Sequence, residues 1–262
     1  MSEEGQHKVK EGRERTPGVD SARRALKVLL LFTGKSAELS VEEIARSVGI
    51  STPSAYRFLS LLREMDLVEE ADRGGYVLAP RLLLLARSAE QAFPVSKVVR
   101  PLVERLSRST GEAALVIRRV GDFAACVEMS QPEHTVRLSF EPGHVMSLHR
   151  GAGPKVLLAA MGEAWARRYF DRLRPPPPAT ERDTVLSEIP AITAQGWSRS
   201  AGEVDEGVWA VAAPITVAGR VLATVSVAGP QFRIDEERGA DIMRQVMEGA
   251  AELSDSLSTW DL

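Results

Sequence analysis

The sequence predicts an α+β protein of two domains, with a small helical head first and a larger domain of mixed strands and helices after it. Three observations lead to this class. Between residues 21 and 92, apolar residues recur mostly at spacings of three and four, as helices with one buried face require. Short apolar runs typical of strands are found mainly after residue 110. Pro94 ends the last helical run of the first part, so we place the domain boundary close to residue 94.

The composition excludes several classes of protein. With 44% hydrophobic and 26% charged residues, the 262-residue chain has too much apolar material to be disordered. It holds 33 Lys and Arg against 36 Asp and Glu, and this net charge of −3 gives no global sign of nucleic-acid binding. No strongly apolar run reaches the roughly 18 to 20 residues that span a bilayer, and the charged N-terminus is unlike a signal peptide. The single cysteine, Cys126, excludes an intramolecular disulfide, so we expect a cytoplasmic protein without membrane contact.

The first elements form a helical head. Residues 1–19 are polar and lack apolar periodicity, which predicts a disordered leader. A first helix follows over residues 21–34, with a stripe formed by Ala22, Ala25, Leu26, Leu29 and Leu30. Ser40 and Glu43 have the spacing of a capping box and predict the start of a second helix, which ends at Gly49.

A third helix begins near Pro53, after a turn of three residues that contains Gly49. Its apolar residues fall on one side and its polar residues on the other, which makes the pair of helices a helix-turn-helix. Two short strands around Gly74 and Gly75 add a wing. The start of a helix can hold a phosphate, and residues 50–63 contain arginines but no acid. The residues that we expect to contact DNA are Ser51, Thr52, Ser54, Tyr56, Arg57, Ser60, Arg63 and Arg73. A winged head of this kind also serves as a protein-docking module, and the pattern alone leaves that alternative open.

The remaining elements complete the predicted organisation. We expect the winged helix-turn-helix over residues 20–80, a linker helix over 81–94 and a second domain over 95–262. The helices predicted in the second domain are 95–110, 155–161, 164–173, a helix near 184–194, and 236–257, and the strands are 113–120, 124–130, 135–140, 208–217 and 221–227.

The head resembles a known family over residues 24–83. The runs that carry the resemblance are Arg24 to Leu29, Leu39 to Ile50, Ser54 to Leu62 and Gly75 to Leu83, and they are similar to the DNA-binding head of the IclR family of bacterial transcriptional regulators. Arg57 holds the family's arginine position. The chain departs from the family at Ser51 and Thr52, where a proline and a basic residue are common, and at Pro53, where Ser or Thr is common.

The second half is similar to the small-molecule sensing domain of the same family. The landmarks are Ser147 to Ala159, Gly196 to Glu203, Gly207 to Ile215 and Ser226 to Pro230, with Arg150 and Pro154 as departures from the usual pattern. The resemblance implies a GAF-like or profilin-like fold with an antiparallel sheet flanked by helices. It also implies a homodimer or tetramer that binds double-stranded operator DNA and a small-molecule effector. The effector-binding residues that we expect are Leu148, His149, Gly151, Ala152, Gly153, Ser200, Glu203, Val208, Ala210, Ser226 and Ala228.

The glycine-rich loop at residues 147–153 suggests the chemistry of the effector. It opens a helix, and the N–H groups and dipole of a helix N-terminus favour an anion, so we expect a carboxylate-bearing metabolite. The alternative is a tight turn that only joins helix to sheet.

Nothing in the sequence indicates catalysis. His144 and His149 lie five residues apart around a turn, and no HExxH, CxxC, GxSxG, P-loop or Rossmann pattern occurs. We therefore expect no catalytic residue, metal or cofactor. The rival interpretation is a small-molecule hydrolase with a regulatory winged head. Residues 21–32 and the helix 81–93 carry more apolar surface than a small head buries, and we expect them to form the dimer contact.

Overall fold

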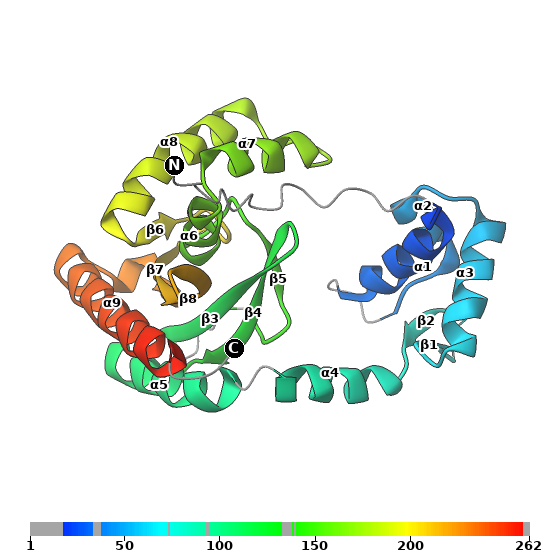
Figure 1. The fold of residues 1–262 in the computed structure, drawn as a ribbon, viewed down its shortest axis with the longest axis horizontal. Coiled ribbons are helices and arrows are strands. Elements are labelled where there is room, and N and C mark those ends of the chain that lie inside the picture. Colours follow the sequence, from blue (N-terminus) through cyan, green and yellow to red (C-terminus); the bar gives the residue numbers. More distant parts are fainter. Residues whose placement is uncertain are drawn as a thin grey trace, which may run out of the picture. The chain divides into compact units, whose positions relative to one another are not determined.

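The computed structural model describes residues 18–33, 38–72, 74–92, 95–132, 138 and 140–258 (Figure 1). The chain divides into two compact units, Met1–Ala86 and Arg87–Leu262. Residues 1–17 of the predicted leader lie outside the described residues. In the described part of the chain, no helix combines the length and apolar character needed to cross a membrane.

The first unit is a three-helix head with a hairpin. Its elements are α1 (Asp20–Leu30), the 3₁₀ turn η1 (Leu31–Thr33), α2 (Val41–Val48), α3 (Thr52–Glu64), β1 (Val68–Glu70) and β2 (Tyr76–Leu78), followed by α4 (Arg81–Ala92). Val28, Ile44 and Leu59, one from each helix, are fully buried in a common core. The predicted winged helix-turn-helix is confirmed.

Local signals in the head mostly behave as predicted. The capping box is confirmed, because the Ser40 hydroxyl accepts from the Glu43 N–H and the Glu43 carboxylate accepts from the Ser40 N–H at 2.8 Å. Gly49 ends α2 in the left-handed conformation (φ 72°), which glycine adopts without strain. The predicted stripe of α1 is wrong in part: the helix buries Ala25 and Val28, whereas Leu26 is 57% exposed. Apolar residues lie on more than one face of this helix, so spacing alone did not identify the buried one.

The second unit is a six-stranded antiparallel sheet with helices on both faces. The sheet has the order β5-β4-β3-β8-β7-β6. Its strands are β3 (Ala113–Val120), β4 (Phe123–Ser130), β5 (Val145–Ser147), β6 (Ser198–Ala201), β7 (Val208–Val217) and β8 (Arg220–Pro230). The helices are α5 (Val95–Thr110), α6 (Ala152–Ala160), α7 (Glu163–Arg172), α8 (Ala179–Gln195) and α9 (Glu236–Ser258), with a 3₁₀ turn η2 (Gln231–Arg233) before α9. The predicted α+β class is confirmed.

The two faces of the sheet have separate cores. Helices α5 and α9 pack on one face, and α6, α7 and α8 lie on the other (Figure 1). Side chains alternate between the faces along each strand, so that Val116 belongs to the α5/α9 core and Leu115 and Ile117 to the α6 core. The predicted stripe of α9, from Ile242 to Leu257, is buried as expected.

Several boundaries differ from the prediction. The strand predicted at 135–140 falls largely on residues outside the description, and the strand that pairs with β4 on that side is β5. Strands β5 and β6, which are three and four residues long and have no two-residue turn beside them to mark a hairpin, were missed. Helix α6 begins at Ala152 instead of residue 155, since Pro154 is tolerated within its first turn.

Candidate DNA-binding and effector sites

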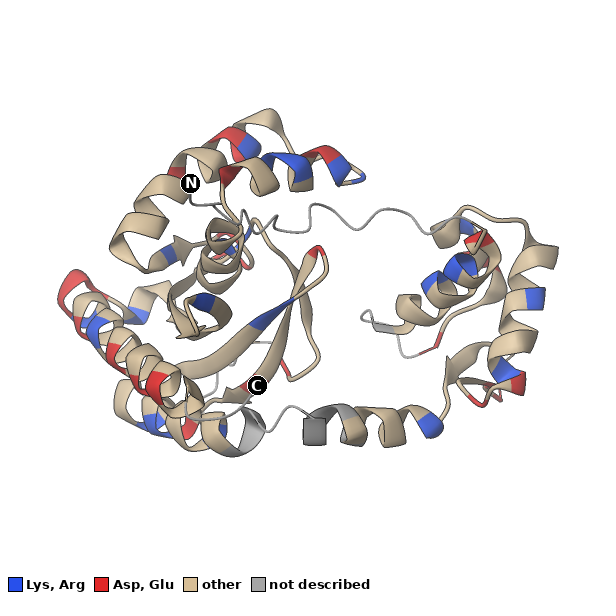
Figure 2. Cartoon of the chain, in the orientation of Figure 1, with Lys and Arg blue, Asp and Glu red and all other residues tan. Residues whose placement is uncertain are grey.

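The outer face of α3 is the candidate DNA-binding surface. Ala55, Leu59 and Leu62 are buried in the core of the head and fix the rotation of the helix. The opposite side is open: Tyr56 is 50% exposed, and Arg57, Ser60 and Arg63 are also exposed. Figure 2 shows basic residues along α3 and acidic residues near its C-terminal end and in the hairpin. Arg73 lies outside the described residues.

The cations of the head differ in their partners. The Arg63 guanidinium pairs with Glu70 at 3.1 Å, and Arg81 pairs with Asp66 at 3.2 Å. The Arg57 guanidinium donates to the Ser54 hydroxyl at 3.4 Å, and the described part of the head gives it no carboxylate partner. Arg57 is therefore the arginine of α3 whose charge is least neutralised.

The start of α3 offers fewer free donors than the sequence suggested. The N–H groups of Ser54 and Ala55 both donate to the Ser51 carbonyl, and Pro53 has no N–H. The Ser51 and Ser54 hydroxyls are bonded to each other at 2.9 Å instead of capping the helix. Within the described residues, the Thr52 N–H is the first-turn donor that remains for a phosphate.

In the second unit, the glycine-rich loop before α6 is closely packed. A Cβ on Gly153 would lie 2.7 Å from the Ile117 side chain and under 3 Å from the hydroxyls of Thr224 and Ser226, so only glycine fits there. Two loop N–H groups are bonded to side chains: Gly151 donates to Glu203 at 2.9 Å, and Ala152 donates to Ser200 at 3.1 Å.

A buried cation lies behind this loop. Lys155 is 2% exposed, and its ammonium donates to Glu203 at 2.6 Å and to Glu188 at 2.8 Å. Glu203 thus contacts both the loop and Lys155, and Glu188 extends the cluster to α8. We refer to Lys155, Glu188 and Glu203 as the lysine cluster.

Leu148 and His149 anchor the other end of the loop. The Tyr169 hydroxyl accepts from the Leu148 N–H at 3.1 Å and lies 2.7 Å from Nδ1 of His149. The Tyr169 hydroxyl and Nδ1 share one hydrogen bond, whose donor depends on the imidazole tautomer, and Nε2 lies 3.5 Å from Glu181. Burial lowers the pKa of His149, and Glu181 opposes this shift. Leu148 and His149 therefore position the loop.

A cavity of about 30 Å³ lies between the first turn of α6 and the sheet. Eight predicted effector residues line it: Gly151, Ala152, Gly153, Ser200, Val208, Ala210, Ser226 and Ala228. Residues that the sequence reasoning did not select complete the lining: Leu115, Ile117, Phe140, Met146, Pro154 and Val204. Leu148, His149 and Glu203 are not among the lining residues. The alternation along β3 places Leu115 and Ile117 on one face, but it does not tell a cavity wall from a packed core.

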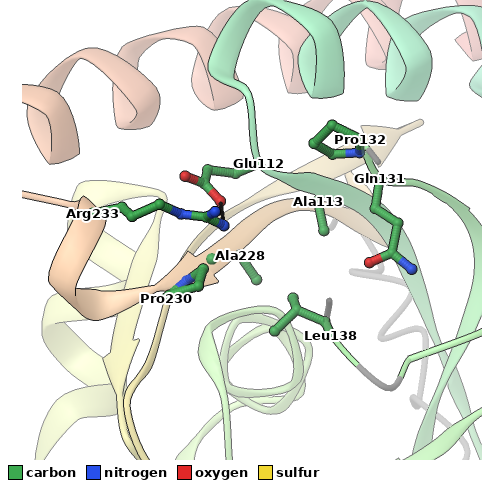
Figure 3. A pocket seen from close by; sticks show the side chains of 9 residues that line it. Glu112, Ala113, Gln131, Pro132, Leu138, Ala228, Pro230 and Arg233 are labelled. Carbon is green, nitrogen blue, oxygen red and sulfur yellow. Dashed lines mark hydrogen bonds and ion pairs between the residues drawn. The ribbon is translucent and has the colours of Figure 1, made fainter. Parts of the chain in front are cut away.

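A smaller cavity of about 10 Å³ adjoins the first (Figure 3). Its polar side chains are Glu112, Gln131 and Arg233. Glu112 is 1% exposed and pairs with Arg233 at 2.7 Å and with Arg238 at 3.0 Å. Ala228 lines both cavities. Ala113 pairs with Ala228 in the sheet, and Leu115 pairs with Ser226, so the two cavities follow each other along the same sheet face.

Neither a metal site nor a reactive cysteine is found among the described residues. They contain no group of three His, Cys, Asp or Glu side chains that could hold a metal ion. Burial raises the pKa of Cys126 to about 12, which keeps its thiol protonated near neutral pH. The Cys126 thiol donates to the Glu128 carbonyl, and the structure shows it no basic partner.

A winged helix-turn-helix followed by a sheet domain with a cavity beneath one of its helices is typical of a DNA-binding regulator with a separate sensing domain. Comparison with known protein families supports both domain assignments. Residues 21–72 match the IclR helix-turn-helix domain, and residues 88–255 match the bacterial transcriptional regulator IclR C-terminal domain. The chain belongs to the IclR family of bacterial transcriptional regulators. These comparisons do not support the hydrolase alternative.

Individual relatives agree over most of the chain. It is 27% identical over 236 residues to the HTH-type transcriptional regulator KipR of Bacillus subtilis, covering 88% of this chain and 94% of KipR. The structure resembles an IclR family transcriptional regulator from Brucella abortus with a TM-score of 0.78 and 23% identity, over 90% of this chain and 92% of the other. It also resembles an IclR homologue from Microbacterium hydrocarbonoxydans complexed with 4-hydroxybenzoate, with a TM-score of 0.71 and 19% identity, over 90% and 99% of the two chains.

Proposed function

We propose that this regulator binds operator DNA through the outer face of α3 and that an effector in the cavity beneath α6 changes that binding. The observation that carries the DNA-binding part is Arg57, which is exposed on the helix that the core of the head orients outward and has no carboxylate partner in the described part of that head. Tyr56, Ser60 and Arg63 flank it on the exposed side of α3. The Thr52 N–H and the Ser51 and Ser54 hydroxyls supply the phosphate contacts.

The regulator acts as a homodimer or a tetramer in the cytoplasm. One helix in one major groove reads few bases, so two heads are needed on half-sites about 34 Å apart or a multiple of that distance. The head carries apolar surface for such a contact: Leu26 on α1 is 57% exposed, and Leu83 and Leu85 on α4 are 67% and 56% exposed. We propose these faces of α1 and α4 as the contact between subunits.

The effector site is the cavity beneath α6. Its walls come from the loop, from β3, β7 and β8, and from Val204 after β6, so a bound molecule contacts several elements at once. The relative complexed with 4-hydroxybenzoate supports a small organic effector for this chain. An effector that favours one DNA-binding state by about 1 to 3 kcal/mol changes operator occupancy several-fold or more.

The test begins with selection of bound fragments from the genome of origin, followed by gel-shift titration. Arg57→Ala is expected to lower operator affinity by about 1 to 3 kcal/mol if Arg57 contacts a base. The matched control is Arg244→Ala on α9, which removes an exposed arginine outside the head. Unchanged affinity for Arg57→Ala would remove this residue from the interface. A selection that returns no DNA would favour the protein-docking alternative.

A further inference from the structure

The C-terminal end of α3 leaves a backbone carbonyl for a partner from another element. The helix ends in a Schellman motif, in which the Asp66 N–H donates to the Arg63 carbonyl and the Leu67 N–H donates to the Leu62 carbonyl. Asp66 adopts the left-handed conformation of this motif (φ 56°), which aspartate tolerates better than most residues. The motif does not use the Met65 carbonyl.

Arg81, the first residue of α4, binds this carbonyl. Its Nη1 atom donates to the Met65 carbonyl at 3.2 Å and to the Asp66 carboxylate at 3.2 Å. A guanidinium at the C-terminal end of a helix also interacts favourably with the helix dipole. Next to it, the Ala79 N–H donates to the Leu67 carbonyl at 3.1 Å. We call the contact of Arg81 with Met65 and Asp66 the α3–α4 joint.

The joint has no counterpart in the apolar core of the head. The described core draws on α1, α2, α3 and the hairpin, and no residue of α4 belongs to it. On α4, Leu83, Leu84 and Leu85 are exposed. Core packing therefore orients α1 relative to α3, whereas polar contacts near Arg81 orient α4.

This difference has a consequence for a dimer that binds two half-sites. The proposed contact between subunits uses apolar faces of both α1 and α4, and both faces can engage together only when the angle between these helices is fixed. The distance between the two α3 helices then depends on that angle. Duplex DNA is demanding in this respect, because one added base pair moves the half-sites about 3.4 Å apart and turns one relative to the other by about 35°.

We infer that Arg81 is a positioning residue that fixes α4 to the end of α3 and thereby sets the half-site spacing that the regulator accepts. The inference rests on the proposed function, because it requires operator binding through α3 by a dimer joined at α1 and α4. In this role Arg81 acts through the α3–α4 joint and not through the DNA. It changes the preference between operators and leaves the affinity of one head for one half-site unchanged.

A series of operators tests the inference with the full-length protein. Gel-shift titration compares the selected operator with versions that have one or two base pairs more or fewer between the half-sites, and with a fragment that holds a single half-site. The spacing preference is the ratio of the Kd for an altered spacing to the Kd for the natural spacing. Arg81→Met is expected to lower this ratio about two- to tenfold, the effect of one or two exposed hydrogen bonds, and to leave the Kd for the single half-site within about twofold.

Two further variants complete the design. Asp66→Asn removes the carboxylate partner of Arg81 and keeps a residue that tolerates the left-handed conformation, so it should lower the same ratio in a folded head. Added to Arg81→Met, it should lower the ratio little further, because both changes remove the same contact. The matched control is Arg46→Met on α2, which removes an exposed arginine of the head outside the joint and should leave the ratio unchanged.

The possible outcomes separate the inference from the proposed function. An unchanged ratio in both Arg81→Met and Asp66→Asn, or a wild-type chain that binds all spacings equally, would overturn the role of Arg81 and leave operator binding intact. An equal loss of affinity for the single half-site and for every operator would show that Arg81 supports the fold of the head alone, which also overturns the inference. A wild-type chain that binds no operator would count against the proposed function itself.

Discussion

Replacing Lys155 with methionine tests whether the lysine cluster holds α6, α8 and the loop together. The Lys155 side chain is 3% exposed, whereas Glu188 is 38% and Glu203 30% exposed. Removing one partner of a fully buried ion pair costs about 3 to 5 kcal/mol. Because both acids can turn partly toward water, we expect a loss of about 2 to 3 kcal/mol in the free energy of unfolding. For a domain of this size that corresponds to a fall in Tm of about 4 to 12 °C.

The tryptophans make this measurement specific to the second unit. Trp165, Trp197 and Trp209 lie in the described part of this unit, and the sequence has no tryptophan before residue 165, so tryptophan fluorescence does not report on the head during urea unfolding. The control is Arg167→Met, which removes an exposed pair with Glu163 and should cost less than about 1 kcal/mol. Equal midpoints for Lys155→Met and Arg167→Met would refute the stabilising role of the cluster. Glu188→Gln should cost less than Lys155→Met, since Lys155 then keeps Glu203.

Three further predictions concern protonation, thiol chemistry and salt. Burial lowers the pKa of His149, so the imidazole takes up a proton near pH 6.5 in the unfolded chain and only at lower pH in the folded chain. The free energy of unfolding should therefore fall as the pH is lowered from about 7.5 to about 5.5. His149→Gln should make the free energy of unfolding, measured by urea titration, less dependent on pH over this range. Cys126 is 1% exposed and its pKa is raised to about 12, so the native protein should not react with a disulfide reagent at pH 8 until urea unfolds it; rapid reaction of the folded protein would contradict its burial. Operator affinity should fall linearly with salt on logarithmic axes despite the net charge of −3, and an affinity insensitive to salt would exclude phosphate contacts.

Local chemistry in the sequence predicted the head well. The capping box at Ser40, the glycine at position 49 and the apolar face of α3 each act over a few residues, so their consequences can be read without knowing the rest of the fold. The exposed polar face of α3 follows directly from that periodicity. What the sequence did not reveal is which arginine is neutralised: Arg63 pairs with Glu70 on the hairpin, a partner that only the folded head brings near.

In the second unit, the sequence predicted most of the cavity lining but not the hydrogen bonds of the loop. Eight of the predicted residues line the cavity, because the landmark segments lead to the right strands. The chemistry of the loop was harder to predict. Its N–H groups were expected to bind an anion. Two of them, on Gly151 and Ala152, donate instead to the side chains of Glu203 and Ser200, which lie about fifty residues later in the sequence. A contact between segments so far apart depends on the sheet order, which no local pattern contains.

The alternation of side-chain size along the central strands explains why the larger cavity lies on the α6 face. On β7 and β8, Val211, Val225 and Val227 face α5 and α9 and fill that core. The residues between them face α6 and are small: Ala210, Ser226 and Ala228. Around the cavity, small side chains on the α6 face of adjacent strands leave space that the valines on the opposite face do not leave. Gly153 then brings α6 close over the hydroxyls of Thr224 and Ser226, which have no hydrogen-bond partner among the described residues. A site built in this way selects its ligand mainly by shape, because the described side chains that line it are mostly apolar and offer few polar groups.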